Sequence, residues 1–427
     1  MGTMEIKNLK GVYDYSPEEM SLRNRITDTL RRNFERFGYR PLETATLNYR
    51  ELLTYKYGDD AEIVREIYKM NDQGERDLGL RFDLTVPFCK YIALNRNLKM
   101  PFKRYEMGKV FRNGPVKSGR NREFWQCDVD VVGDGSPEIE AELLALAVKC
   151  YTELGIVPQI QIGNRKLLLS LIKHCGATAN TDEIIGIIDK VKKVDKTETL
   201  TNLSKYMKRA DAEKLMQYIG YGIADLEKEF PNNEGIAEIK RLFELLNQLQ
   251  IANSCVFAPS LARGLNVYTG TVWEVFDASG RYSSSLGGGG RYDDIITNFI
   301  GTGTKYPAIG MAFGLEPITA VLSADNDKHS TTELLIVPLG TYRDSNALAE
   351  ALRDNGVNIM LWTANNKVGK ALEYANATAI NFVAVIGENE TKSGIIKIKN
   401  MQTGKEHDFP FAQTTAIAKF LFYARSI

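Results

Sequence analysis

The sequence carries no excess of charge of either sign. Its 427 residues include 54 Lys+Arg and 54 Asp+Glu, which gives a formal net charge of zero. A protein that binds nucleic acid over its whole surface would carry surplus basic residues, so any contact with RNA has to come from a local patch. No run of about twenty apolar residues is present, and the N-terminal MGTMEI has no apolar signal core. We therefore expect neither a membrane span nor membrane partners.

Cysteine and histidine are scarce. The five cysteines include no Cys-x-x-Cys pair, and the three histidines, His174, His329 and His407, are scattered. This spacing argues against a zinc site or a His-rich metal site, and it gives little support to a Cys–His nucleophile pair. We expect no metal held by the protein alone, and buried free thiols in a reducing cytosol.

The hydrophobic pattern divides the chain into regions of different character. Helical spacing predicts a helix over residues 17–37, which Gly38 ends, while 39–47 looks extended. Residues 137–154 are typical of a helix rich in Ala, Leu and Glu. Residues 167–250 are helical throughout, with many Lys and Glu, and this indicates an inserted helical module.

Two further regions are rich in strands. Residues 102–111 and 123–132 alternate as the strands of an antiparallel hairpin, joined by a long charged loop. After a polar linker at 323–330, strands alternate with helices up to a last helix. This alternation predicts a separate small α/β domain.

The hairpin loop concentrates basic residues. Four of them lie within eleven residues: Arg112, Lys117, Arg120 and Arg122. Guanidinium groups bind phosphate oxygens in a bidentate manner, so the loop suits a polyphosphate, although a solvated basic loop would have the same composition. Gln126, Asp128 and Asp130 alternate in the next strand and therefore share one face. Such a row behind an arginine loop is typical of the floor of a polar pocket.

Three other segments can carry chemistry. Arg263 lies among apolar residues and is interpreted either as half of a structural ion pair or as a cation facing an anionic centre. The glycines at 287–290 predict either a flexible turn or backbone packed against a ligand. Asp83 and Thr85 alternate as on one strand face, where a carboxylate could hold an ammonium group, although Thr85 could instead cap a helix. The sequence contains no P-loop and no Rossmann glycine motif.

Taken together, these segments resemble the histidyl-tRNA synthetases, a class II aminoacyl-tRNA synthetase family, over nearly the whole chain. The resemblance rests on the segments RFDLTVPFCKYIA, FKRYEMGKVFRNGPVKSGRNREFWQCDVDVVG, SLARGLNVYTGTVWEV, GGGGRYDDI, PAIGMAFGLEPI and ELLIVPLG through NFVAVIGENE. It implies an α+β class II catalytic core over 1–325, with a mixed, mainly antiparallel sheet flanked by helices. It also implies that 167–250 is the helical insertion and that 333–427 is an α/β anticodon-binding domain.

The resemblance implies a reaction, a set of partners and a role for each matching residue. The reaction is ATP-dependent activation of L-histidine and its transfer to the 3′ end of tRNA(His), by a cytoplasmic homodimer in which Mg²⁺ bridges the ATP phosphates. The catalytic residues are Arg112 and Arg263. Histidine is bound by Asp83, Leu84, Thr85, Arg112, Gln126, Asp130, Arg263, Val267, Tyr268 and Tyr292, and ATP by Arg112, Arg120, Arg122 and Glu123.

Some positions depart from the family pattern, and we therefore consider two alternative functions. The departures are Ala45, Asn113, Asn121, Asn266, Val267 and Pro317. One alternative is a non-catalytic paralogue that senses histidine and regulates histidine biosynthesis, although such regulators usually lack the anticodon-binding domain. The other is a synthetase-like enzyme for a different amino acid, suggested by Asn266 and Val267.

Overall fold

The computed structural model describes residues 4–55, 62–116, 119–177, 179–191, 194–262, 267–323, 330–364 and 367–423. The chain forms two compact units. The first comprises residues 1–14 and 25–324, and the second comprises residues 15–24 and 325–427. Each unit is described by itself.

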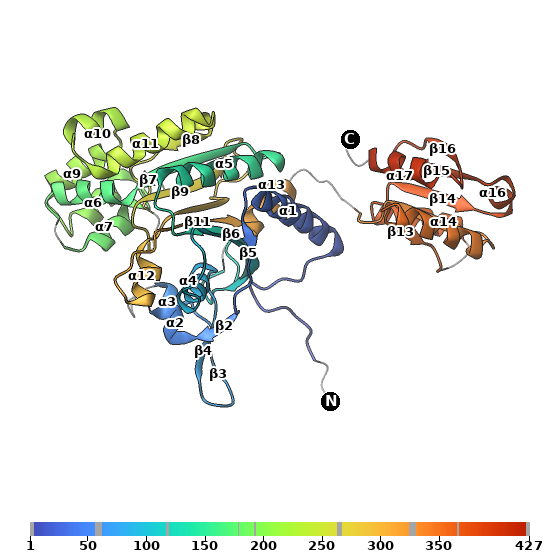
Figure 1. Ribbon diagram of the computed structural model, residues 1–427, viewed down its shortest axis with the longest axis horizontal. Helices are drawn as coiled ribbons and strands as arrows, with labels where there is room; N and C mark the ends of the chain where they lie inside the picture. Colours follow the sequence, from blue (N-terminus) through green and yellow to red (C-terminus); the bar gives the residue numbers. More distant parts are fainter. Residues whose placement is uncertain are drawn as a thin grey trace. The chain divides into compact units, whose positions relative to one another are not determined.

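The first unit is built around an eight-stranded sheet with the strand order β1-β5-β6-β11-β10-β9-β7-β8 (Figure 1). Its pairs are antiparallel except for β1 with β5 and β7 with β8. The expected mixed, mainly antiparallel sheet is therefore confirmed. The strands are β1 (Arg40–Pro41), β5 (Phe102–Phe111), β6 (Glu123–Val132), β7 (Pro158–Asn164), β8 (Cys255–Phe257), β9 (Thr271–Asp277), β10 (Gly287–Arg291) and β11 (Ala308–Gly314).

The two faces of this sheet are covered by different helices. On one face lie α1 (Pro17–Arg36) and α5 (Pro137–Glu153), where the rings of Phe34 and Tyr151 lie 5.4 and 5.3 Å from the ring of Phe313. On the other face, α4 (Thr85–Leu94) and α12 (Asp294–Ile300) pack together with apolar residues of β5, β6 and β11. The second face also carries the polar side chains of β6, so one side of the sheet is an apolar core and the other is available for a site.

A smaller antiparallel sheet, β2-β4-β3, precedes the hairpin, and it corrects one expectation. Its strands are β2 (Leu47–Tyr49), β3 (Lys69–Asn71) and β4 (Asp77–Leu80), with α2 (Arg50–Thr54) and α3 (Glu62–Arg65) between β2 and β3. The prediction that Asp83 and Thr85 share a strand face is wrong, because β4 ends at Leu80. Thr85 is the first residue of α4, and Asp83 Oδ1 accepts a hydrogen bond from the Val86 backbone N–H at 3.0 Å. The N-cap position is Leu84, so the side chain that accepts a hydrogen bond from the first turn belongs to Asp83 and not to Thr85.

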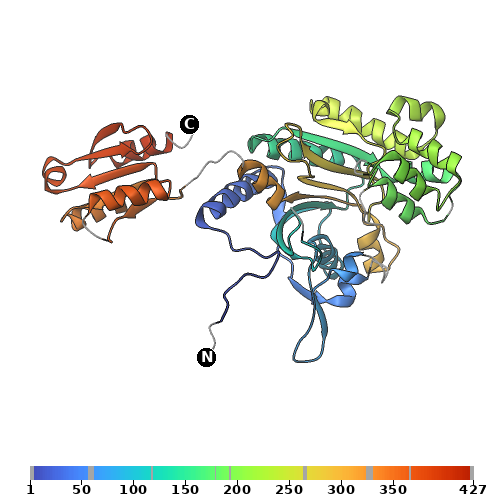
Figure 2. The ribbon, with the colours of Figure 1, turned by 180° about the vertical axis from the view of Figure 1, so that it is seen from behind.

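The region expected to be a helical module does consist of helices. They are α6 (Arg165–His174), α7 (Thr181–Ile188), α8 (Lys196–Leu203), α9 (Arg209–Tyr218), α10 (Ile223–Glu229) and α11 (Glu234–Gln248). They enclose an apolar cluster of their own, which includes Leu171, Ile184 and Leu215. Figure 2 shows these helices, in green to yellow, gathered at one end of the large sheet. Among the described residues, no helix combines the length and the apolar character needed to cross a lipid bilayer.

The second unit contains a five-stranded sheet with the order β13-β12-β14-β15-β16. The first three strands are parallel, as expected for strands alternating with helices, and the last two are antiparallel. The hairpin β15–β16 and the short α16 were not expected. The elements are β12 (Leu334–Pro338), α14 (Tyr342–Asp354), β13 (Ile359–Leu361), α15 (Val368–Ala377), β14 (Phe382–Ile386), α16 (Glu388–Ser393), β15 (Ile395–Asn400), β16 (Glu406–Pro410) and α17 (Thr414–Tyr423).

Candidate active site

The candidate site lies along β6, where a polar row faces very small neighbours. Gln126 and Asp130 lie opposite Gly314 and Gly310 of β11, and Asp128 lies opposite Ala312. Directly opposite residues of an antiparallel pair share one face, so side chains of the row can approach the β11 backbone closely. The Asp130 carboxylate packs directly against the Gly310 backbone, since a Cβ on Gly310 would lie 1.9 Å from Asp130 Oδ1.

Charged side chains from β5 complete this face. Arg104 is fully buried and lies 2.7 Å from Asp130 and 3.4 Å from Glu106, which in turn lies 2.9 Å from Arg81. The Tyr292 hydroxyl donates a hydrogen bond to Asp130 Oδ1. Burial raises the pKa of the Asp130 carboxyl above its usual range, although Arg104 and Tyr292 act against the rise. Burial also raises the pKa of Tyr292, so its hydroxyl keeps its proton and stays a donor.

Three buried acceptors of the row lack a hydrogen-bond partner among the described residues, and one of them, Asp130 Oδ2, has the ion pair with Arg104 instead. Asp128 Oδ1 and Gln126 Oε1 are buried, and neither has a hydrogen-bond partner among the residues that the structure describes. Asp128 is only 3% exposed. Burial raises its pKa well above the usual value, Arg104 acts against this, and Asp130 and Asp83 add to it. Buried acceptors of this kind are usually satisfied, so they mark a place where donors of a ligand can bind.

Arg112 extends the same face beyond the end of β5. Its Nε donates to the Phe82 carbonyl at 3.1 Å, and its guanidinium lies 5.0 Å from the centre of the Phe124 ring. Its backbone N–H donates to the Arg122 carbonyl at 2.8 Å, which closes the base of the hairpin loop. Arg112 is half-buried, so its side chain borders the same face as the polar row.

The other residues expected to bind ATP already contact protein groups. Arg120 forms an ion pair with the buried Glu66, and Glu123 lies 2.6 Å from Lys109. Arg122 is held through its backbone N–H, which donates to the Gly11 carbonyl at 2.8 Å. Lys117 lies outside the described residues.

The residues expected around the histidine ring lie close together where they are described. Val267, Tyr268 and Tyr292 belong to one apolar cluster, and a Cβ on Gly290 would lie 2.8 Å from a Tyr268 ring carbon. The Leu84 carbonyl accepts a hydrogen bond from Arg104 at 3.2 Å, which joins the start of α4 to the polar row. Arg263 and Asn266 lie outside the described residues.

The glycine run does not form the flexible turn that was one of its two interpretations. Gly287 to Gly290 belong to β10 and pair with both β9 and β11. Their small size serves close backbone packing, because a Cβ on Gly289 would lie 2.0 Å from the Gly310 carbonyl oxygen. The neighbouring Arg291 is a structural residue that pairs with the buried Glu140 at 2.7 Å.

Sequence reasoning missed several residues that shape the site. They are Arg81, Arg104, Glu106, Glu66 and Glu316. Glu316 lies at the start of α13 (Leu315–Ser323), and its carboxylate accepts a hydrogen bond of 3.2 Å from the Trp125 backbone N–H. The sequence pattern could have predicted two of these residues as part of the site. Arg104 and Glu106 alternate in β5 just as the polar residues alternate in β6.

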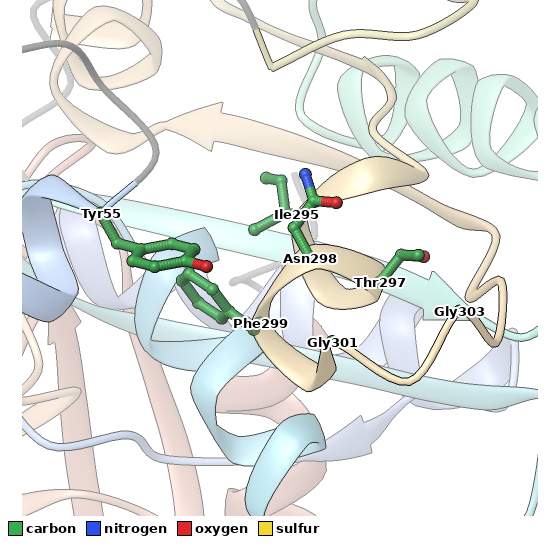
Figure 3. Close-up of a pocket in the computed structure, with 7 residues that line it drawn as sticks. All are labelled: Tyr55, Ile295, Thr297, Asn298, Phe299, Gly301 and Gly303. Atoms are coloured by element: carbon green, nitrogen blue, oxygen red, sulfur yellow. The ribbon is translucent and has the colours of Figure 1, made fainter.

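Another pocket, of about 480 Å³, lies at α12 (Figure 3). The Tyr55 and Phe299 rings lie edge to face at 5.2 Å. The pocket is lined by Tyr55, Ile295, Thr297, Asn298, Phe299, Gly301 and Gly303. None of these side chains is charged, and none belongs to the residues predicted to bind histidine or ATP.

Comparisons with known proteins agree with this geometry. Residues 11–318 match the family described as Histidyl-tRNA synthetase, and residues 333–420 match the family described as Anticodon binding domain. The chain belongs to the histidyl-tRNA synthetase family. The predicted resemblance is thereby confirmed.

Individual relatives of this synthetase family match over almost their full length. Histidine–tRNA ligase 1 of Bacillus thuringiensis subsp. konkukian is 43% identical over 419 residues, which cover 96% of this chain and 99% of the relative. Histidine–tRNA ligase 2 of Shouchella clausii is 41% identical over 424 residues, covering 96% of this chain and all of the relative. The crystal structure of histidyl-tRNA synthetase from Nostoc sp. PCC 7120 has a TM-score of 0.85 at 26% identity and covers 98% of this chain and 100% of that one.

These matches decide between the functions considered from the sequence. The predicted class II aminoacyl-tRNA ligase, with its α+β core and C-terminal anticodon-binding domain, is confirmed at the level of family and fold. The histidine-sensing regulator is not favoured, because this synthetase retains the anticodon-binding domain that such regulators usually lack.

Proposed function

We propose that this chain is a histidine–tRNA ligase that joins L-histidine to the 3′ end of tRNA(His) at the expense of ATP. The observation that carries the proposal is the buried polar row of β6, which faces Gly310 and Gly314 and runs toward Arg112. In a chain of this family, such a row binds a small polar amino acid and places its carboxylate at a cation.

In this proposal the substrate histidine lies along the polar row. Its imidazole lies at the end formed by Asp130, Tyr268 and Tyr292, with Val267 and Leu84 as apolar walls. Its amino group lies near Asp83, Thr85 and Gln126, and its carboxylate faces Arg112 and Arg263. The hydrogen bond from Tyr292 and the ion pair with Arg104 fix the Asp130 carboxylate, which supports its use as a rigid acceptor.

The ATP phosphates lie over the base of the hairpin loop. Arg112 contacts the α-phosphate, while Arg120, Arg122 and Glu123 bind the rest of the nucleotide. Because Arg120 is paired with Glu66, its contact with a phosphate requires an exchange of partners. Mg²⁺ bound with the nucleotide would neutralise part of the phosphate charge. No group of three or more His, Cys, Asp or Glu side chains in the described parts of the chain is placed to hold a metal ion.

Catalysis then rests on positioning and on charge. A histidine carboxylate oxygen attacks the α-phosphorus in line, the bond to the bridging oxygen breaks, and pyrophosphate leaves with the electron pair. Arg112 and Arg263 stabilise the negative charge that develops on the phosphoryl oxygens. The terminal ribose hydroxyl of the tRNA next attacks the adenylate carbonyl carbon and releases AMP.

The domains and partners follow from the same proposal. Residues 1–325 form the catalytic domain, 167–250 its helical insertion, and 333–427 the anticodon-binding domain that recognises tRNA(His). The protein acts as a cytoplasmic homodimer in protein biosynthesis, where its tRNA and ATP are available.

The decisive experiment is histidine-dependent ATP–pyrophosphate exchange, followed by charging of tRNA(His). We expect exchange with L-histidine and none with other amino acids, and charging of tRNA(His) alone. Exchange with a different amino acid would support the alternative specificity suggested by Asn266 and Val267. Absence of exchange with all twenty amino acids would exclude any ligase.

A further inference from the structure

The buried charges beneath the polar row do not balance among the described residues. Three carboxylates, Glu106, Asp128 and Asp130, share this space with two guanidinium groups, Arg81 and Arg104, and all five residues are at most 5% exposed. Arg81 pairs with Glu106, and Arg104 pairs with Asp130. Among these five residues, Asp128 is the carboxylate that forms no ion pair with a described residue, so its charge is the least compensated.

The position of Asp128 makes this charge costly in the free protein. Its Oδ1 accepts no hydrogen bond from the described residues, and the neighbouring acceptor on the same face, Gln126 Oε1, also lacks a donor. An unpaired carboxylate in a low-dielectric environment is unfavourable by several kcal/mol or takes up a proton. Both effects disappear when a cation with N–H donors binds beside it.

We infer that Asp128 is a further histidine-binding residue, and that its carboxylate accepts a hydrogen bond from the α-ammonium group of the substrate. This inference rests on the proposed function. The row would then hold histidine at three successive side chains of one strand face.

The α-ammonium group fits this position better than the imidazole ring. Near neutral pH an α-amino group is mostly protonated, whereas an imidazole with a pKa near 6.5 is mostly neutral, so only the ammonium group supplies a full positive charge. Asp128 also lies close enough to Asp83 for their charges to interact, and Asp83 stands at the start of α4, where the amino group is expected. The ring end of the row, at Asp130, is already neutralised by Arg104.

Asp128 would therefore act in specificity. A ligand without the ammonium group leaves a buried carboxylate unpaired, and a site built around a polar partner rejects such a ligand strongly. Asp130, by contrast, already has Tyr292 and Arg104 as partners without a ligand.

The test combines a change in the protein with a change in the ligand. Dissociation constants are measured by calorimetry for L-histidine, for histidinol, which keeps the ammonium group, and for imidazolepropionate, which lacks it. In Asp128→Asn we expect the first two constants to rise about 10- to 100-fold, as for a lost hydrogen bond to a charged group, and the third to change by less than about threefold. In pyrophosphate exchange, KM for histidine should rise while KM for ATP stays unchanged.

Stability in the absence of ligand provides a second readout. Because Asp128 Oδ1 has no hydrogen-bond partner among the described residues, Asp128→Asn and the smaller Asp128→Ser should both fold and melt at or above the wild-type temperature. A neutral variant that fails to fold would overturn the inference, because it would show that the fold itself needs this charge. Asp225→Asn is the matched control and should change none of these values, because Asp225 is exposed on α10, where it pairs with Lys228 at 3.4 Å.

The outcomes separate the two proposals. If wild-type protein activates histidine but Asp128→Asn binds all three ligands normally, the role of Asp128 is wrong and the proposed function stands. An equal loss of affinity for imidazolepropionate would likewise overturn the contact with the ammonium group. If wild-type protein neither binds nor activates histidine, the proposed function fails, and the role of Asp128 fails with it.

Discussion

Replacing Arg104 with methionine should lower the unfolding free energy of the first unit, because Arg104 is the buried cation that pairs with both Asp130 and Glu106. The guanidinium is fully buried, and it also lies 4.3 Å from the centre of the Phe88 ring. Methionine keeps part of the apolar stem but leaves Asp130 without its ion pair. Removing one partner of a buried ion pair typically costs about 3–5 kcal/mol, and we expect a loss of that size at neutral pH.

The pH dependence of this loss has a defined sign. Burial already raises the pKa of Asp130 and Asp128, and Arg104 is the group that opposes the rise in both. Without Arg104 the two carboxyl groups have still higher pKa values. As the pH falls through these values, the carboxyl groups take up protons and no longer need a cation, so the variant should recover stability relative to wild type. The difference in unfolding free energy should therefore be smaller at pH 5 than at pH 7.5.

Urea unfolding followed by tryptophan fluorescence can measure the effect in the first unit alone. Trp125 and Trp273 belong to that unit and Trp362 to the other, so a Trp362→Phe background makes the signal specific. A double variant with Asp130→Asn restores the buried charge count and should recover part of the stability.

The control is Arg209→Met, which breaks an exposed pair with Glu213 on α9 and should cost less than about 0.5 kcal/mol. A loss below about 1 kcal/mol for Arg104→Met, or one independent of pH, would refute the account of the buried network.

Two further predictions concern the site. Gly310→Ala places a Cβ 1.9 Å from Asp130 Oδ1, so it should raise KM for histidine in pyrophosphate exchange and destabilise the first unit by about 1–3 kcal/mol in thermal melting. Gly186→Ala is the matched control, because nothing lies within 4 Å of its Cβ, and it should be neutral or stabilising. Arg112→Ala and Arg263→Ala should each lower adenylate formation about 10²–10³-fold with little change in melting temperature, and near-normal exchange in either variant would remove that arginine from catalysis.

The sequence was most informative where local pattern and final structure obey the same rule. β5 and β6 have the predicted bounds, because both strands alternate along ten residues and the loop between them is polar. The face shared by Gln126, Asp128 and Asp130 could be predicted for the same reason. Family resemblance then supplied what alternation alone could not, namely which ligand such a face serves.

The errors have physical causes that lie outside local pattern. Asp83 was placed on a strand because two alternating polar residues do not distinguish a strand from a helix start. The glycines of β10 have no side chains and therefore no strand propensity, and their conformation is set by pairing with β9 and β11. The ion pairs of Arg104 and of Glu66 join segments distant in the sequence, so only the folded chain brings them together.

The buried thiols offer a means of observing the first unit from within. All five cysteines are free and buried, and burial raises the pKa of Cys255 to about 12. In the folded protein they should therefore react slowly with alkylating reagents, and each thiol should become reactive only when its surroundings open. They are distributed over different elements: Cys89 in α4, Cys127 in β6, Cys150 in α5, Cys175 after α6 and Cys255 in β8. Labelling rates compared with and without histidine would show which of these elements the ligand holds closed.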